Sequence, residues 1–199
     1  MPTRRPLSRA LRRAIAKLPA KEKDRLIFRL LPGNPDMVGK LTFQLLADTT
    51  MREARAEMRR QVGQQAEELL HRYASPQFLL REYRAVSAEI AQYRKRTRDK
   101  VGEVELTLLL WNTTLPNLLE ELTAPIPKLG NTLFKYILQR AVKLLRTLSK
   151  VTAEERLEQT PALIELGETI YQIPNLREMA TRTGFDVNWL LSGEWPQDL

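Results

Sequence analysis

Residues 101–122 have the sequence VGEVELTLLLWNTTLPNLLEEL, and this stretch decides the fold class. Its apolar residues, among them Leu106, Leu110 and Trp111, fall on several sides of a helix rather than on one. A helix with this pattern is expected to be central and largely buried. The alternative is a buried strand over 104–110, but no partner strand with period-two alternation occurs elsewhere in the chain. We therefore expect an all-α protein.

The rest of the chain is also helical in its apolar periodicity. A basic segment over 7–18 carries one narrow apolar stripe, formed by Leu7, Leu11, Ile15 and Leu18. Helices joined by short turns marked with proline or asparagine favour antiparallel helical hairpins. Helix pairs recur roughly every 40–50 residues, near the period of armadillo and HEAT repeats. No residue pattern repeats at a fixed period, so an irregular α-α superhelix and a helical bundle both fit.

Local signals place the helix boundaries. Asn34 before Pro35 and Ser75 before Pro76 combine a capping residue with a proline at the first helical position. Thr152 and Glu155 have the spacing of a capping box. We expect four helices over about 7–18, 49–73, 76–98 and 101–122 and a fifth from Asn131. A further helix starts at Thr152, and Pro161 is able to interrupt it. A short helix near the C-terminus is capped by Asn175 and ended by Gly184.

The segment 124–127, Ala-Pro-Ile-Pro, is a rigid connector and the best internal boundary. We expect an N-terminal helical array with basic first helices over 1–123. A C-terminal helical subdomain over 128–199 then packs on it. One continuous domain is the alternative, because a chain of 199 residues fits one domain or a tightly joined pair.

The composition removes several kinds of site. The chain has no cysteine, one histidine and eight glycines, so a disulfide, a thiolate metal site and a cysteine nucleophile are excluded. No GxGxxG or P-loop sequence is present. Glu68 and His71 have the Glu-x-x-His spacing of carboxylate di-iron bundles, but such a site needs a second histidine. We expect no cofactor, no metal site and no catalytic centre.

The net charge of +8 is unevenly distributed. Residues 1–30 carry ten basic and two acidic side chains, 128–150 carry six basic and no acidic ones, and 151–199 carry three basic and nine acidic ones. No secretory signal is visible, and no apolar run is long enough to span a bilayer. We therefore expect a cytoplasmic protein without a transmembrane segment.

Three groups of cations are candidates for contact with phosphates or with an acidic partner. They are Arg4, Arg5, Arg9, Arg12, Arg13 and Lys17 near the N-terminus, Arg94, Lys95, Arg96, Arg98 and Lys100 at a helix end, and Arg140, Lys143 and Arg146 as one helical ridge. Such cations bind phosphates with release of counterions. Alternatively, the first group packs against the acidic C-terminal third or lies on an anionic membrane, and the second complements a helix C-terminus. A nucleic-acid groove requires the second and third groups to share a concave surface.

Residues 174–194 have the sequence PNLREMATRTGFDVNWLLSGE. This segment resembles the part of Cro/Xre-type helix-turn-helix domains that follows the recognition helix. The residues themselves predict a small helical corner, in which Gly184 ends one helix while Val187 and Leu190 pack the next turn. The DNA-reading helices of that family would fall in 145–172, which is acidic, so no DNA-reading residue is carried over. The chain as a whole resembles uncharacterised bacterial helical-array proteins of the HEAT-like type, a resemblance that implies no activity.

The function expected from the sequence is that of a non-catalytic helical scaffold or protein–protein interaction module. Its partner would be another protein that docks on a helical face, and an acidic surface fits best. The alternative is a binder of nucleic-acid phosphates that uses the basic N-terminal helices, residues 4–29. An enzyme comes third because no catalytic constellation appears. The oligomeric state is not indicated.

Overall fold

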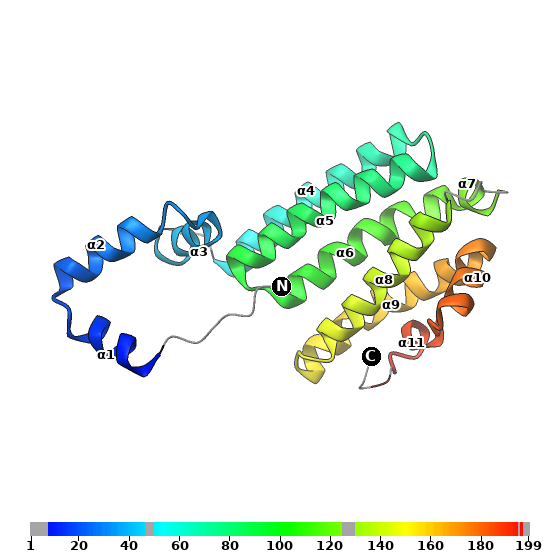
Figure 1. Cartoon of the computed structure of the whole chain (residues 1–199). Helices are drawn as coiled ribbons and strands as arrows, with labels where there is room; N and C mark the ends of the chain where they lie inside the picture. The colour runs from blue at the N-terminus through cyan, green and yellow to red at the C-terminus, as the bar shows by residue number, and fades with distance from the viewer. Residues whose placement is uncertain (1–7, 47–49, 125–129, 195, 197–199) are drawn as a thin grey trace. The chain divides into compact units, whose positions relative to one another are not determined.

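The computed structural model describes residues 8–46, 50–124, 130–194 and 196, and all regular structure in these ranges is helical (Figure 1). The expected all-α fold class is therefore confirmed. The chain divides into two units, Met1–Ala47 and Asp48–Leu199. Residues 125–129, in the connector at which we placed the internal boundary, lie outside the described ranges.

The first unit contains α1 (Arg9–Lys17), α2 (Ala20–Leu30) and α3 (Pro35–Leu46). Two of these helices begin with a side-chain cap. Ser8 Oγ accepts a hydrogen bond from Leu11 N at 3.2 Å, and Asn34 Oδ1 accepts one from Met37 N at 3.3 Å. The cap at Asn34 was predicted from the sequence. Pro19 separates α1 from α2, because the residue before a proline disfavours the helical conformation.

The second unit begins with a long antiparallel hairpin. Gln65 of α4 donates a hydrogen bond to Glu89 of α5. Arg55, ten residues before Gln65, donates one to Asp99, ten residues after Glu89, so the two segments run in opposite directions. The elements of this unit are α4 (Met51–Arg72), α5 (Pro76–Thr97), α6 (Lys100–Thr114), the 3₁₀ turn η1 (Pro116–Leu118), α7 (Leu119–Thr123), α8 (Gly130–Leu148), α9 (Ala153–Gln172), α10 (Pro174–Thr183) and α11 (Asn188–Leu191).

The central position predicted for the helix after residue 100 is confirmed. Ten of the fifteen residues of α6 are buried, and the helix contacts α4, α5, α8 and α9. It ends at Thr114 rather than at 122. Pro116 explains the earlier end, because it has no N–H to donate to the carbonyl of Asn112. The chain continues as η1 and α7 instead of a single long helix.

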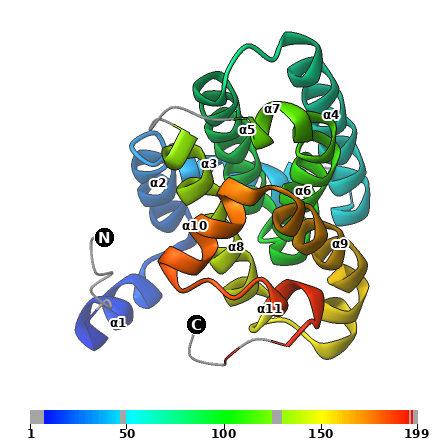
Figure 2. The same cartoon turned by 90° about the vertical axis from the view of Figure 1, so that its right-hand side faces the viewer.

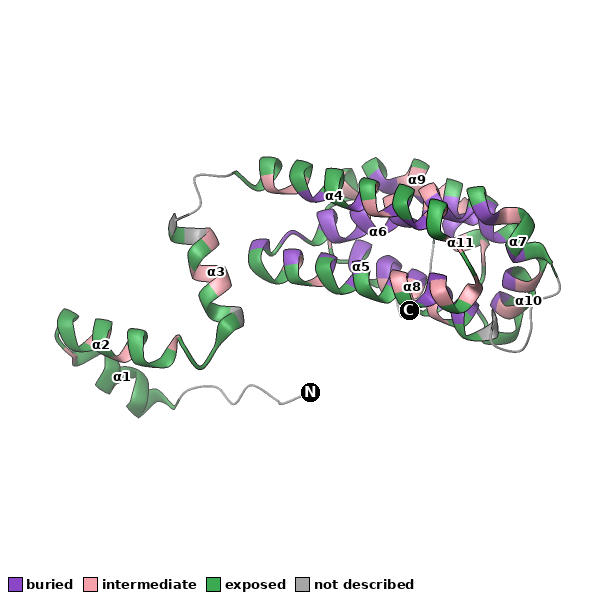
Figure 3. Ribbon diagram, turned by 90° about the horizontal axis from the view of Figure 1, so that it is seen from above, coloured by how far each residue is buried: buried purple, intermediate pink, exposed green. Residues whose placement is uncertain are grey.

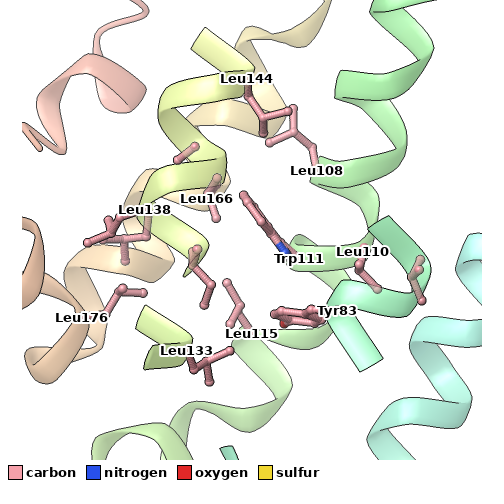
Figure 4. Packing of buried hydrophobic residues seen from close by; sticks show 14 of the residues in the cluster. Tyr83, Leu108, Leu110, Trp111, Leu115, Leu133, Leu138, Leu144, Leu166 and Leu176 are labelled. Atoms are coloured by element: carbon pink, nitrogen blue, oxygen red, sulfur yellow. The ribbon is translucent and has the colours of Figure 1, made fainter. Parts of the chain in front are cut away.

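One continuous hydrophobic core joins α4 to α11, and its buried residues appear in purple in Figure 3. The core includes Met58 of α4 and Leu190 of α11, on opposite sides of the connector. Trp111 of α6 is fully buried within it, with Tyr83 and Leu166 nearby (Figure 4). Because the helices on the two sides of the connector share this core, the connector does not separate two domains. Residues 48–199 form one unit, and the boundary lies instead between 47 and 48.

Pro161 does not interrupt its helix. α9 runs without a break from Ala153 to Gln172, and the predicted capping box at its start is confirmed by reciprocal hydrogen bonds between Thr152 and Glu155. Proline inside a helix removes one backbone hydrogen bond. Leu163 and Ile170, which follow the proline, are fully buried, and we infer that their packing holds the helix together across this gap.

The helical corner predicted near the C-terminus is present, with one difference at its start. Pro174 is the first residue of α10, and Asn175 does not cap the helix but donates a hydrogen bond to Ala124 O at 3.4 Å. Gly184 ends α10 with a φ of +71°, a left-handed conformation that glycine adopts without steric cost. The rings of Phe185 and Trp189 then meet edge to face, with their centroids 5.5 Å apart. In this region α10 and α11 pack against α8 and α9 (Figure 2).

Trp111→Ala is expected to lower the free energy of unfolding by about 3–5 kcal/mol, because deletion of a fully buried aromatic side chain leaves a cavity. Urea unfolding followed by circular dichroism measures the change. The matched control is Tyr171→Ala in α9, where the side chain is 57% exposed. This variant should stay within about 0.5 kcal/mol of the wild type. Equal losses in the two variants would contradict the assigned core.

Candidate functional site

The turn between α5 and α6 places a buried carboxylate at the start of the central helix. Asp99 accepts hydrogen bonds from Arg55 Nε at 2.7 Å and Nη2 at 2.8 Å, from Tyr93 Oη at 2.6 Å and from Gly102 N at 2.8 Å. The bond from Gly102 caps α6. The two bonds from Arg55 form a bidentate ion pair with α4, the strongest geometry for such a pair.

The turn between α5 and α6 consists of Arg98 and Asp99. Arg98 has a φ of +63°, and its N–H donates to Arg94 O at 2.8 Å, which closes the end of α5. The left-handed conformation costs a non-glycine residue roughly 1–2 kcal/mol. The bonds to Asp99 hold the turn in this conformation. The sequence gives no sign of it, because glycine is the usual residue at such a helix end.

A second carboxylate lies one turn further along α6. Glu103 is 5% exposed. Arg94 Nη1 of α5 lies 2.6 Å from its Oε2, and Lys143 Nζ of α8 donates a hydrogen bond to its Oε1 at 2.7 Å. Glu105 pairs with Arg59 and also, at 3.5 Å, with Arg55 of α4. We call these groups together the ion-pair network: Asp99, Glu103 and Glu105 with Arg55, Arg59, Arg94 and Lys143.

The pKa shifts in the network favour a structural role. Burial raises the pKa of Asp99, but the hydrogen bonds from Arg55, Tyr93 and the Gly102 amide outweigh it and lower that pKa below its usual value. The pKa of Tyr93 is raised, first by burial and then by the hydrogen bond that its hydroxyl donates to Asp99. The carboxylate therefore stays charged and the phenol neutral around pH 7. A general acid or base needs a pKa near the working pH, which neither group has.

α5 and α8 lie side by side and run in the same direction. Tyr136 of α8 donates a hydrogen bond to Ser87 of α5 at 2.9 Å. Seven residues further along both helices, Lys143 and Arg94 meet on Glu103. The equal spacing on the two helices establishes a parallel pair. We call the surface between them the α5–α8 groove.

A pocket of about 360 Å³ opens in the α5–α8 groove. Its cations are Arg84 of α5 and Arg140 of α8, and small side chains of α5, including Ala88 and Ala91, line it. The guanidinium carbons of both arginines lie 5.8 Å from the centroid of the Tyr136 ring. Within the part of the chain that the structure describes, neither arginine forms an ion pair with a carboxylate.

A larger pocket of about 470 Å³ lies on another face of α8, against the C-terminal corner. Apolar side chains such as Val142, Phe185 and Trp189 line one part of it, and the polar side chains of Lys135, Gln139, Arg146 and Thr183 line the rest.

The structure brings together three of the cations that the sequence proposed. Arg94 and Lys143 meet, but on the internal carboxylate of Glu103, and Arg140 lies in the α5–α8 groove. The other proposed residues are placed as follows: Lys95, Arg96, Arg98 and Lys100 are exposed around the α5–α6 turn, Arg146 lines the apolar pocket, Arg9, Arg12, Arg13 and Lys17 are exposed on α1, and Arg4 and Arg5 lie outside the described residues.

Sequence reasoning missed Arg84 and Tyr136. The available signal is the run of small residues at Ser87, Ala88 and Ala91, which lie on one side of α5 and allow a neighbouring helix to approach closely. It also missed the cations that pair with Asp99, Glu103 and Glu105, because helical periodicity does not reveal which charge a distant helix presents.

Other candidate chemistry finds no support in the geometry. Glu68 and His71 are both exposed on α4. Among the described residues, no three His, Cys, Asp or Glu side chains gather closely enough to hold a metal ion. None of the described helices combines the length and the apolar character that crossing a membrane requires.

Comparison with known proteins adds no assignment. The chain matches no protein-family model, no curated protein and no solved structure.

Two glycines provide a matched test of the Asp99 site. A Cβ added at Gly102 would lie 2.2 Å from Asp99 Oδ2 and 3.2 Å from Arg55 Nε. Gly102→Ala should therefore displace the carboxylate and lower the free energy of unfolding by about 2–4 kcal/mol. A Cβ added at Gly63 in α4 meets nothing within 4 Å. Gly63→Ala should therefore raise the free energy of unfolding by about 0.5–1 kcal/mol. Thermal and urea unfolding measure both, and stabilisation by Gly102→Ala would contradict the geometry.

The lowered pKa of Asp99 predicts a dependence of stability on pH. Its pKa is lower in the folded protein than in the unfolded chain, where aspartate titrates near about 3.9. The stabilisation from the charged form is therefore fully present above the unfolded value and is lost as the pH falls through the folded value. Asp99→Asn should lower the free energy of unfolding at pH 7, and the difference from the wild type should shrink below about pH 4. Urea unfolding at about pH 7 and at several values below about pH 4 tests this, and a difference that stays constant down to the lowest pH would refute it.

Proposed function

We propose that the protein is a non-catalytic scaffold that binds another protein through its first unit, Met1–Ala47. The observation that supports this most directly is that none of the described side chains in 8–46 is buried, as the green and pink helices α1–α3 of Figure 3 illustrate. Helices of this length are marginal in water without packing against an apolar face. A partner that covers the unit would supply the packing that the unit itself lacks.

Large apolar side chains are exposed on all three helices of this unit. Phe28 is 69% exposed and Leu30 is 68% exposed. Burial of one such side chain stabilises a contact by about 1.5–3 kcal/mol. A small number of them is therefore enough to anchor a partner. Among the side chains that the structure describes in this unit, the large exposed apolar ones are Leu11 and Ile15 on α1, Ile27, Phe28 and Leu30 on α2, and Met37, Val38 and Leu45 on α3.

The charge of the unit favours an acidic partner. Residues 1–30 carry ten basic side chains and two acidic ones. On α1 the four basic side chains Arg9, Arg12, Arg13 and Lys17 are exposed and form no ion pair with a described acid of their unit. A hollow of about 520 Å³ on the unit combines Leu18 and Leu26 with Arg25, Arg29 and Glu22. An apolar patch rimmed by carboxylates would complement such a surface in both respects.

A nucleic acid and an anionic membrane are the competing partners for these cations. Phosphate contacts use basic side chains and leave exposed groups such as Phe28 and Leu30 without a role. An anionic membrane would use both kinds of side chain, but residues 1–27, which carry most of the cations, contain neither Trp nor Phe to anchor a basic helix at the membrane interface. A protein partner needs no such anchor, and we therefore place it first.

Site-specific photo-cross-linking tests the proposal. Phe28→p-benzoylphenylalanine in the full chain, irradiated in the cells that produce the protein naturally, should yield a cross-link to a second protein. That protein, once purified, should bind the unmodified chain. Its Kd should weaken at least tenfold with Phe28→Asp, and also when Arg9, Arg12 and Arg13 are all changed to Glu. Arg96→Glu, on the exposed side of α5, is the matched control and should leave the Kd within about twofold.

Three results would overturn the proposal. A cross-link within the chain to residues 151–199 would mean that the basic unit closes on the acidic C-terminal third. Retention of short nucleic acids or of anionic vesicles, lost in the same charge-reversal variant and without any cross-linked protein, would identify the other partner classes. A purified partner whose affinity does not respond to any of these substitutions would place the binding surface elsewhere.

A further inference from the structure

We infer that the α5–α8 groove contains a binding site for the phosphate group of a small ligand, in which Arg84 and Arg140 hold the phosphate oxygens. The site lies wholly within the second unit, Asp48–Leu199. It is therefore independent of the partner surface proposed for the first unit, and each proposal can fail without the other.

Tyr136 holds the two arginines in one place. The hydrogen bond from its hydroxyl to Ser87 Oγ, 2.9 Å long, fixes the ring between α5 and α8. The guanidinium carbons of Arg84 and Arg140 both lie 5.8 Å from the ring centroid, within the range of cation–π contacts. Both side chains also line the same pocket of about 360 Å³. We infer that one ligand in this pocket contacts both guanidinium groups.

Arg140 carries a donor without an acceptor. Its Nε is buried and has no hydrogen-bond partner among the described residues. Buried donors without acceptors are rare in native proteins. A phosphate oxygen in the pocket would supply the acceptor, and the planar guanidinium group matches the geometry of phosphate oxygens.

No carboxylate within the described ranges pairs with the two arginines. α8 has no Asp or Glu between Gly130 and Leu148, and the residues of α5 that line the pocket include no acid. Glu89 of α5 accepts a hydrogen bond from Gln65 of α4, and so faces a different helix. Glu103 is already paired with Arg94 and Lys143. The positive charge at Arg84 and Arg140 is thus left for an external anion.

The geometry favours a single phosphate group over a polynucleotide backbone. A backbone needs a row of cations that release counterions on binding. The next cations along the groove, Arg94 and Lys143, are engaged with Glu103 instead. The pocket volume is near the lower end of the range for small-molecule sites. The ligand class is therefore a free phosphate ion or a small phosphate monoester, which share the same oxygens.

Isothermal titration calorimetry of the full chain, with inorganic phosphate and separately with ribose 5-phosphate, tests the site. At least one of them should bind with one site per chain. Arg84→Gln and Arg140→Gln should each weaken binding at least tenfold. Arg96→Gln, at an exposed cation of α5 outside the pocket, is the matched control and should stay within about twofold. Circular dichroism melts establish that each variant folds, and Arg84→Lys, which keeps the charge, should retain part of the affinity.

Each outcome decides for or against the site. Tighter binding of ribose 5-phosphate identifies a monoester as the ligand, and equal binding identifies the phosphate ion; both support the proposal. Absence of binding of either probe at about 10 mM overturns it. So does binding that folded Arg84 and Arg140 variants leave unchanged. Binding of a single-stranded oligonucleotide but of neither small probe would overturn it in favour of a backbone groove.

Discussion

The acids at and within the central helix constrain how four helices meet. Asp99 and Glu103 are buried. Leaving one buried carboxylate without its cation costs about 3–5 kcal/mol, a large part of the 5–15 kcal/mol that is typical of a domain's free energy of folding. α4 provides Arg55, α5 provides Arg94, and α8 provides Lys143. Apolar packing by itself tolerates many arrangements of similar volume. We infer that these pairs select one register, because a helix that slid by one turn would leave a carboxylate unpaired.

The same pairing separates the cations of the chain into two classes. Arg94 and Lys143 neutralise Glu103 and belong to the interior of the second unit. Arg84 and Arg140 lie against the ring of Tyr136 and form no ion pair with a described carboxylate, and the cations of α1 have no described acidic partner in their own unit. Net charge alone does not distinguish these classes. Surfaces that remain available for an anion or an acidic partner are therefore fewer than the basic composition suggests.

Several features were predictable because they depend on neighbouring residues. The apolar residues around Trp111 indicated a buried helix, and Thr152 with Glu155 indicated a capping box, since both patterns act within a few turns of chain. The effect of Pro116 on the end of α6 was underestimated. Of the two arrangements that the sequence left open at the connector after Ala124, the shared core fits one continuous domain, because prolines mark where the chain turns and do not indicate whether the helices on either side share a core.

The helical class, most helix starts, the absence of cysteine chemistry and the concentration of positive charge in residues 1–30 follow from the amino-acid sequence without any coordinates. The division of the charges into internal ones and ones that remain open to a ligand becomes visible when the helices are packed together. Lys143 and Glu103 lie forty residues apart in the chain, and Tyr136 and Ser87 forty-nine. Helical periodicity reports the side of a helix on which a residue lies. Periodicity carries no information on the side chain that another helix places opposite a residue. Both proposed binding surfaces depend on whether a neighbouring helix covers or neutralises their side chains.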